Sequence, residues 1–173
     1  ITSCQDLTPM GRVMARDLQI HLNRHWRNRK NPHVKIQITK ENKQSLLWWT
    51  KKDNVMCGTP LRPPQPTVEM WTDASTLGAG GSLKTQHSSQ TLEFSMKWDP
   101  ETAKNHINYL ELAAVKQALH IWEDLVTNQS ILLHVDNTTC LSYINKSSGS
   151  RSPQMHHLCQ EILLWCHHRG ITL

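Results

Sequence analysis

Five consecutive segments in the second part of the sequence have the patterns of strand, strand, strand, helix and strand. This order restricts the fold more than any other feature. Polar and apolar residues alternate in 68–73 and 92–98, as in half-buried strands, and 78–83 is glycine-rich, as in a strand that passes close to another backbone. Apolar residues recur at helical spacing in 108–125, and 131–135 is almost wholly apolar. Short connections predict an antiparallel meander of three strands, and the helix then allows a parallel fourth strand.

The residues that follow continue this pattern. A short helix is expected at 138–145 and a longer helix at 153–168, and 171–173 looks like a strand that has only begun. The predicted fold class is therefore α/β, with a mixed sheet of three antiparallel strands and then parallel strands, and with helices packed against it. Because 131–135 has too few polar positions for a half-exposed strand, we expect it to be a buried central strand.

Four prolines between residues 60 and 66 mark a domain boundary. Prolines this dense favour an extended connector, so 61–67 is interpreted as a Pro-rich linker. Residues 68–173 then form the α/β domain, and residues 1–60 form a helical appendage that takes no part in the sheet.

Within the appendage, apolar residues at helical spacing predict a helix from Thr8 to about Trp26, with Thr8 as its N-cap. Residues 34–38 alternate like a short strand, and Thr39 is expected to cap a second helix. The first residue is Ile1 rather than Met, so we expect the sequence to be a piece of a longer protein.

Composition narrows the class of protein. The 173 residues carry a formal net charge of +5 and a sequence pI of about 9.1, which weakly favours a polyanionic partner. Five cysteines without a tight spacing indicate free thiols in a reducing compartment. No apolar run approaches the roughly 18 residues of a membrane span, so we expect no membrane partner and an intracellular location, in the cytoplasm or the nucleus.

Three acidic residues lie in the predicted elements at positions from which their side chains can converge on one point. Asp73 ends the first strand, Glu111 lies in the first turns of the helix, and Asp136 follows the apolar run. Taken singly, Asp73 fits a turn and Asp136 fits a helix cap, whereas Glu111 lies beside apolar positions and needs a partner. Converging carboxylates repel one another unless cations lie between them. The set therefore predicts a site for Mg²⁺ or Mn²⁺, with two ions, as in enzymes that hydrolyse phosphodiesters.

The motifs around these acids resemble those of ribonuclease H type 1 domains, and more closely the domain that follows reverse transcriptase in retroelements. The likeness spans Val68 to Leu173, and its details are similar to the DIRS-type, tyrosine-recombinase retrotransposon branch. It is carried by Asp73-Ala74-Ser75 with Gly78, His106 to Leu112, Val135 to Thr139, and Tyr143 to Lys146 with Gly149, Arg151 and Ser152.

This resemblance implies a ribonuclease H-like fold and cleavage of the RNA strand of RNA–DNA hybrids, in which the 2′-OH distinguishes the strands. Asp73, Glu111 and Asp136 would be the catalytic, metal-binding acids, and residues 1–60 would be the region that connects to a polymerase. The partners would be the hybrid and a reverse transcriptase domain upstream in the same polyprotein. The candidates for nucleic-acid contact are Ser75, Asn108, Thr138 and Arg151, with Asn108 at the sugar edge of the substrate.

Two alternatives remain open at this point. One is a non-catalytic nucleic-acid-binding module, a degraded or domesticated copy, and the other is a DNA-acting nuclease or transposase of the same superfamily. The three intact acids favour catalysis, and Glu111 between the two aspartates differs from many DNA transposases, whose third acid comes last. The family usually supplies a fourth acid after the fifth strand. Because the sequence stops at Leu173, we expect the fragment to be C-terminally truncated and a poor nuclease.

The last predicted helix is rich in histidine and cysteine, which raises the question of zinc. A straight helix cannot easily place four ligands around one ion in tetrahedral geometry. We therefore expect a helix with an exposed histidine face and no metal there; the residues concerned are His156, His157, Cys159, Cys166, His167 and His168.

Overall fold

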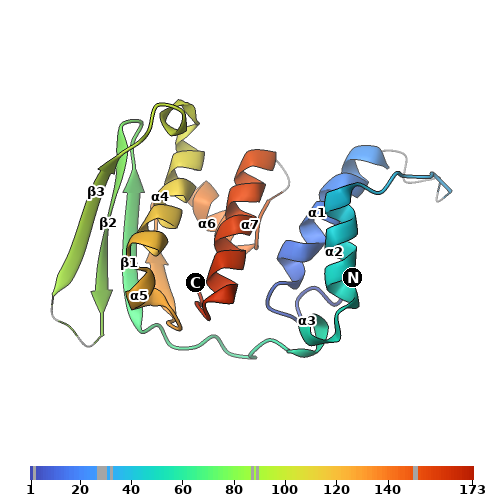
Figure 1. Cartoon of the computed structure of the whole chain (residues 1–173), viewed down its shortest axis with the longest axis horizontal. Coiled ribbons are helices and arrows are strands. Elements are labelled where there is room, and N and C mark those ends of the chain that lie inside the picture. The colour runs from blue at the N-terminus through green and yellow to red at the C-terminus, as the bar shows by residue number, and fades with distance from the viewer. Residues whose placement is uncertain (2, 27–30, 32, 87, 89, 150–151) are drawn as a thin grey trace.

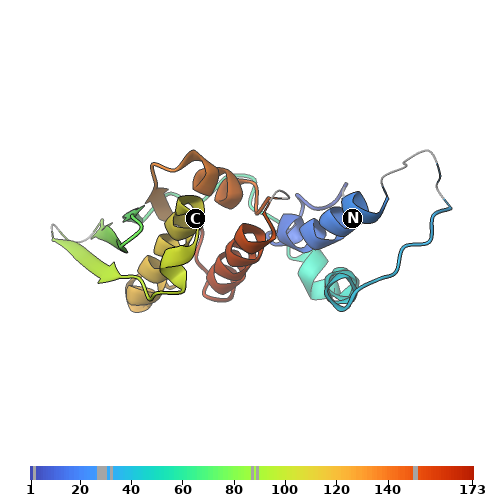
Figure 2. The same ribbon diagram turned by 90° about the horizontal axis from the view of Figure 1, so that it is seen from above.

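The structure is a computed structural model that describes residues 1, 3–26, 31, 33–86, 88, 90–149 and 152–173. Its sheet lies at one end of the molecule and the N-terminal helices lie at the other, with the remaining helices between them (Figure 1). The same order is seen from above, where helix α7 (Pro153–His168) lies between α4 (Ile107–Ile121) and α1 (Gly11–His25) (Figure 2).

Four strands form one sheet: β1 (Val68–Ala74), β2 (Gly78–Thr85), β3 (Thr91–Lys97) and β4 (Ile131–His134). Their order is β3-β2-β1-β4, with β1–β2 and β2–β3 antiparallel and β1–β4 parallel. The predicted meander and the parallel fourth strand are thus confirmed, and the fold is the mixed α/β class expected from the sequence.

The expectation that the fourth strand is buried is wrong for one of its faces. Among the described residues, β4 pairs with β1 on one side and makes only one isolated parallel bridge on the other, between Ser130 and Thr172. Ile131 points into the core, but Leu132 is 44% exposed. A wholly apolar run predicts burial on both faces, whereas only the face that carries Ile131 packs into the core.

The core lies between the sheet and α4. Residues of β1 alternate between buried and accessible, so that Val68 and Met70 face the buried side of the helix, which includes Leu110 and Ala114. Helix α4 ends at Ile121, and the predicted continuation is a separate short helix, α5 (Glu123–Val126). Helix α6 (Thr138–Asn145) and α7 occupy the predicted ranges and complete the core beside α4. A 3₁₀ turn, η1 (Thr102–Lys104), leads into α4.

The glycines of β2 allow the close approach that the sequence predicted. A side chain at Gly78 would place its Cβ 2.1 Å from the carbonyl oxygen of Met96, and one at Gly81 would lie 2.5 Å from that of Trp71. Both obstacles are backbone atoms of neighbouring strands, so they cannot move without breaking the sheet. The meander therefore depends on glycine at these two positions.

The N-terminal part contains α1, α2 (Lys40–Thr50) and α3 (Lys52–Met56), and none of its described residues joins the sheet. Thr39 caps α2 as predicted, in a reciprocal pair with Asn42. Thr8, in contrast, is not the cap of α1, which begins at Gly11 after Met10. Its hydroxyl donates instead to the carbonyl oxygen of Asn54, at 2.8 Å, and so ties the beginning of the segment to its end.

The strand predicted at 34–38 does not form. No described residue pairs with this segment as a strand, and Val34 and Ile38 are exposed. Alternation alone cannot stabilise a strand that has no neighbour to accept its hydrogen bonds.

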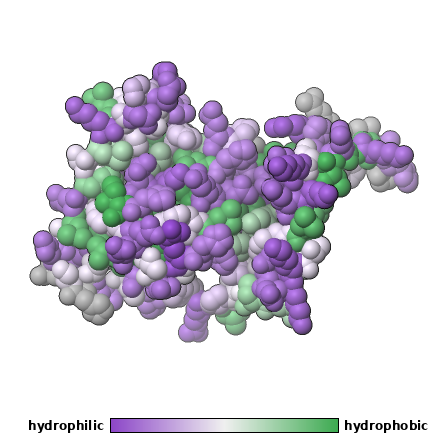
Figure 3. All heavy atoms as spheres, in the orientation of Figure 1, coloured by the Kyte–Doolittle hydropathy of each residue, from purple (hydrophilic) through white to green (hydrophobic). Residues whose placement is uncertain are grey.

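The molecular surface seen in Figure 3 is mostly polar, with apolar residues in small groups. No described helix has both the length and the apolar character to cross a membrane. The five cysteines are free thiols, as expected. Cys140, Cys159 and Cys166 are buried in the core, and burial raises the pKa of each to about 12.

Candidate active site

The parallel pairing of β1 and β4 places two carboxylates at the same edge of the sheet. Trp71 is paired with His134, so Asp73 and Asp136 each lie two residues beyond this pair. Because β3 runs in the same direction as β1, the chain enters α4 near that edge, which brings Glu111 in the first turns of the helix toward the two aspartates. Oxygen atoms of the three carboxylates lie within 4.8 Å of one another.

Glu111 is the buried member of this acidic cluster. It is 4% exposed, and its Oε2 atom has no hydrogen-bond partner in the described part of the chain. Burial, followed by the charges of Asp73 and Asp136, raises its pKa to about 7, although a hydrogen bond from the backbone of Ala74 acts in the opposite direction. A carboxylate in this position is costly as an anion unless a cation is beside it.

The donor set fits a hard divalent cation. Three carboxylates supply only oxygen ligands, which Mg²⁺ and Mn²⁺ prefer, and the orphaned Oε2 of Glu111 is a buried ligand atom without another role. Asp73 and Asp136 are exposed at the mouth of the cluster, so ions held there would remain accessible to a substrate and to water. The arrangement can therefore hold metal ions for attack on a phosphodiester.

The residue after Asp136 caps the helix that follows. Asn137 is the N-cap of α6, and its Oδ1 accepts a hydrogen bond from the backbone N–H of Cys140 at 2.9 Å. The segment from Asp136 to Thr139, considered as a possible helix cap, thus supplies the cap through Asn137, and the Asp136 carboxylate is left free for the cluster. The signal for this role was an Asn directly before the predicted helix, because Asn is among the preferred N-caps.

Asn137 also fixes the orientation of Asn108. Its Nδ2 donates to the Oδ1 of Asn108 at 2.9 Å, which leaves the amide N–H groups of Asn108 as the donors that can face a ligand. Asn108 itself lies in the first turn of α4, whose N-cap is His106. The structure thus places Asn108 beside the residue that follows Asp136.

The other predicted contact residues are placed differently. The hydroxyl of Ser75 accepts hydrogen bonds from the backbone N–H groups of Leu77 and Gly78, each at 3.2 Å, and thereby closes the β1–β2 turn. Thr138 is exposed at the first position of α6, with its side chain accessible. Arg151 lies outside the described residues.

A groove of about 770 Å³ runs along the sheet beside Asp73 and Asp136. On its wall, the rings of Trp71 and His134 are stacked, with centroids 4.6 Å apart and an interplanar angle of 5°. Sequence reasoning did not single out this pair, because the two residues meet only through the β1–β4 register. The groove gives an extended ligand access to the acidic cluster.

Comparison with known proteins agrees with this architecture. Residues 63–163 match the family described as the RNase H-like domain found in reverse transcriptase, and the chain belongs to this family. No curated protein matches the chain. The resemblance to a reverse transcriptase ribonuclease H-like domain, expected from the motifs, is thereby confirmed.

Two solved structures are similar to the chain at low identity. The crystal structure of prototype foamy virus protease–reverse transcriptase shares 14% identity, with 92% of this chain and 22% of that chain covered and a TM-score of 0.44. The structure of the foamy viral protease–reverse transcriptase dRH in complex with double-stranded DNA shares 13% identity, with 99% and 29% covered and a TM-score of 0.43. The chain thus spans less than a third of the length of either structure.

Proposed function

We propose that this chain is the ribonuclease H domain of a retroelement reverse transcriptase polyprotein, of the DIRS-type branch, and that it hydrolyses the RNA strand of RNA–DNA hybrids. The observation that carries the proposal is the convergence of Asp73, Glu111 and Asp136, with oxygen atoms within 4.8 Å of one another at the edge of the sheet. Membership of the family of RNase H-like domains found in reverse transcriptase supports it, because reverse transcription is the context in which such hybrids arise.

The three acids would hold Mg²⁺ or Mn²⁺, as two ions. When bound, such ions lower the pKa of a water nucleophile and stabilise the leaving oxygen. Glu111 is fixed on a buried helix and anchors the cluster from below, while the exposed Asp73 and Asp136 face the groove. The buried Glu111 would keep the ligand geometry rigid, and the exposed Asp73 and Asp136 would leave the bound ions accessible to the phosphodiester.

Recognition of the hybrid would come from groups around the cluster. The N–H donors of Asn108, oriented by Asn137, match the acceptors of a ribose 2′-OH or a base edge in the minor groove. Thr138, Ser75 and Arg151 are the further candidates for nucleic-acid contact; the hydroxyl of Thr138 is exposed, whereas that of Ser75 is engaged in its turn. The backbone of Ser75 would then contribute more than its side chain.

The proposed domain organisation follows the same boundaries as the sequence pattern. Residues 68–173 are the ribonuclease H-like domain, 61–67 the linker, and 1–60 the helical region that connects to a polymerase domain upstream. Three helices in the first part, and the extended course of residues 59–67, support this division.

The test is cleavage of a 5′-labelled RNA–DNA hybrid in Mn²⁺ or Mg²⁺, compared between the natural chain and Asp73→Asn. We expect cuts in the RNA strand only, at least about 100-fold slower in the variant, because a metal ligand is lost while the side-chain shape is kept. Hybrid binding, measured by fluorescence anisotropy in Ca²⁺, should be retained by Asp73→Asn. Because this chain is expected to be a poor nuclease, the same assay is run on a form extended past Leu173. Binding without cleavage by the extended form would favour the non-catalytic module, and cutting of the DNA strand would favour the DNA-acting alternative.

A further inference from the structure

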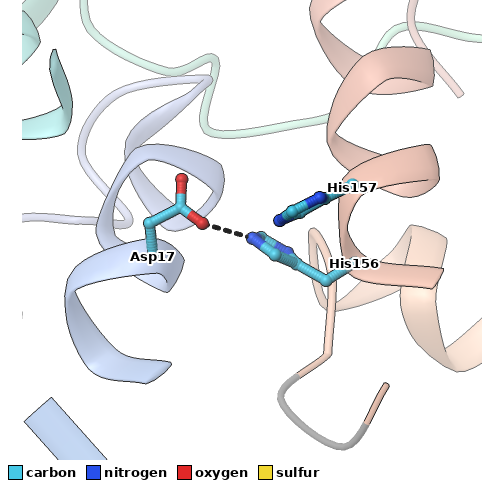
Figure 4. Close-up of side chains that lie close together, drawn as sticks. All are labelled: Asp17, His156 and His157. Carbon is cyan, nitrogen blue, oxygen red and sulfur yellow. Dashed lines mark hydrogen bonds and ion pairs between the residues drawn. The ribbon is translucent and has the colours of Figure 1, made fainter. Parts of the chain in front are cut away.

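A second cluster of metal-ligating side chains lies far from the acidic cluster, where the N-terminal helices meet α7. Asp17 of α1 points toward His156 and His157, which are adjacent on α7 (Figure 4). One ligand atom from each of the three residues lies within 4.8 Å of the others. The cluster joins parts of the chain that are 139 residues apart.

His156 corrects the expectation of an exposed histidine face on this helix. Its side chain is 1% exposed, and both ring nitrogens are engaged: Nε2 with Oδ1 of Asp17 at 2.6 Å, and Nδ1 with the hydroxyl of Ser148. Ser148 is itself buried and has a φ of 99°, a strained conformation for a residue other than glycine. Ser148, His156 and Asp17 do not form a hydrolytic triad, because Ser148 is only 2% exposed and cannot reach a substrate.

We propose that Asp17, His156 and His157 form a binding site for a borderline transition-metal ion of the Zn²⁺ class, which fastens the N-terminal helices to α7. Two imidazoles and one carboxylate are a ligand set that suits Zn²⁺ and leaves a fourth position open. The site is distinct from the acidic cluster, whose all-oxygen ligands select harder ions.

For Asp17 and His156 the geometry requires little movement. Tetrahedral Zn²⁺ has metal–ligand distances of about 2.0–2.2 Å, so two of its ligand atoms are about 3.3 Å apart. The Nε2 of His156 and the Oδ1 of Asp17 would therefore separate by less than about 1 Å from their hydrogen-bonded 2.6 Å. In the hydrogen-bonded arrangement one proton lies between these atoms, and the ion would take the place of that proton.

The surroundings already supply the orienting contacts that metal sites need. A metal-binding histidine is usually fixed by a hydrogen bond from its other ring nitrogen, and the Ser148 hydroxyl occupies that place at Nδ1 of His156. The second oxygen of Asp17 accepts a hydrogen bond from Nε2 of Gln160 at 3.0 Å. Burial acts to raise the pKa of Asp17, but the hydrogen bonds from His156 and Gln160, with the charges of both histidines, outweigh it and lower the pKa. Asp17 is therefore held as the carboxylate, the form that binds metal.

The orientation of His157 toward the cluster is not explained by a hydrogen bond. Its ring lies 5.3 Å from that of His156 and makes no hydrogen bond within the described part of the chain, yet it is directed to the same place. It lines a groove of about 670 Å³ together with Asp17, Glu41 and Lys51, so an ion has access from solvent. The carboxylates of Asp17 and Glu41 outnumber the one ammonium group of Lys51 there.

A single straight helix cannot easily supply four ligands, but in this cluster Asp17 comes from a different helix than the two histidines. The cysteines of α7 are not involved. Cys159 donates from its thiol to the carbonyl oxygen of Tyr143 at 3.3 Å, and Cys166 is buried in the core. The proposed ligands are thus nitrogen and oxygen atoms only.

The test is calorimetric titration of the whole 173-residue chain with Zn²⁺, in excess Mg²⁺ to occupy the acidic cluster, followed by Co²⁺, whose visible absorption reports tetrahedral coordination. We expect one equivalent to bind. Binding should weaken at least about tenfold in His157→Gln and in Asp17→Asn. His168→Gln, which changes an exposed histidine at the other end of the same helix, and Asp73→Asn should bind as the natural chain does.

His157 is exposed, so His157→Gln should fold normally. If Asp17→Asn does not fold, Zn²⁺ binding by His157→Gln is the test of the proposed site. Absence of Zn²⁺ binding would overturn the proposal and leave Asp17 and His156 as a hydrogen-bonded contact alone. Binding that persists in His157→Gln but is lost in His168→Gln or in Asp73→Asn would overturn it equally, since the ion would then lie elsewhere.

Discussion

At the scale of single residues, the candidate active site depends on one carboxylate that is costly to bury. Glu111 has no donor for its Oε2 atom, and two further carboxylates face it. Natural cores avoid this arrangement unless a ligand offsets it. The buried carboxylate of Glu111, which faces two other carboxylates and lacks a donor for Oε2, is therefore the strongest indication of a cation site among the described residues.

The raised pKa of Glu111 predicts how the pH affects stability. Its folded-state pKa of about 7 lies above its ordinary value of 4.5, so between these values the folded state binds more protons than the unfolded state. The contribution to stability is therefore present below about pH 4.5, falls as the pH rises through 7, and then stays level. Urea unfolding in EDTA at pH 5 and pH 8 should show a larger loss of stability for the natural chain than for Glu111→Gln, and Mg²⁺ at pH 8 should recover it. Equal losses in both proteins would contradict the assignment.

A second residue-level prediction concerns Asn137. Asn137→Ala removes the cap of α6 and the contact to Asn108, and should lower the free energy of unfolding by about 1 kcal/mol. Asn137→Ser retains a capping oxygen but lacks the amide Nδ2–H group that donates to Asn108. If Asn137 orients Asn108 for the hybrid, Asn137→Ser should have nearly normal thermal stability but weaker hybrid binding by anisotropy. Normal binding by Asn137→Ser would show that the orientation of Asn108 is unimportant.

At the scale of elements, the strands of the sheet could be predicted because the pattern that indicates each strand lies within a few consecutive residues. The alternation in β1 and β3, the glycines of β2 and the helical spacing of α4 are all readable from neighbouring residues. The ordered positions of Asp73, Glu111 and Asp136 follow from the same elements. The exposure of Leu132 could not be predicted, because it depends on which neighbours β4 has in space.

The glycines of β2 allow a matched test at this scale. A methyl group at Gly81 would lie 2.5 Å from the carbonyl oxygen of Trp71, whereas one at Gly80 would have Phe94 O at 3.4 Å as its nearest atom. Gly81→Ala should therefore lower the free energy of unfolding by about 1–3 kcal/mol, as in other overpacked sites. Gly80→Ala should be close to neutral in the same thermal or urea experiment. Similar losses in both variants would mean that β2 does not pack against its neighbours as described.

At the scale of the whole molecule, the contacts that join distant segments escaped sequence reasoning. The local pattern predicts Thr8 as a helix cap, but its partner Asn54 is 46 residues away. The pattern of α7 predicts an exposed histidine face, but His156 is covered by α1 through Asp17. A side chain that satisfies a remote partner has no local pattern, so burial and hydrogen bonding of this kind are visible only in the folded chain.

The same contact predicts how the N-terminal helices contribute to stability. Asp17→Asn removes a charged hydrogen bond to a buried histidine, and in EDTA it should lower the free energy of unfolding by about 1.5–3 kcal/mol. The control is Asp6→Asn, which breaks the exposed ion pair with Arg12 on the same N-terminal part and should cause no measurable change. Because Asp17 also holds α1 on α7, Asp17→Asn should expose residues 57–67 to faster cleavage in limited proteolysis, with a folded remainder. If Asp17→Asn matches Asp6→Asn in both experiments, the N-terminal helices are held to the domain by other contacts.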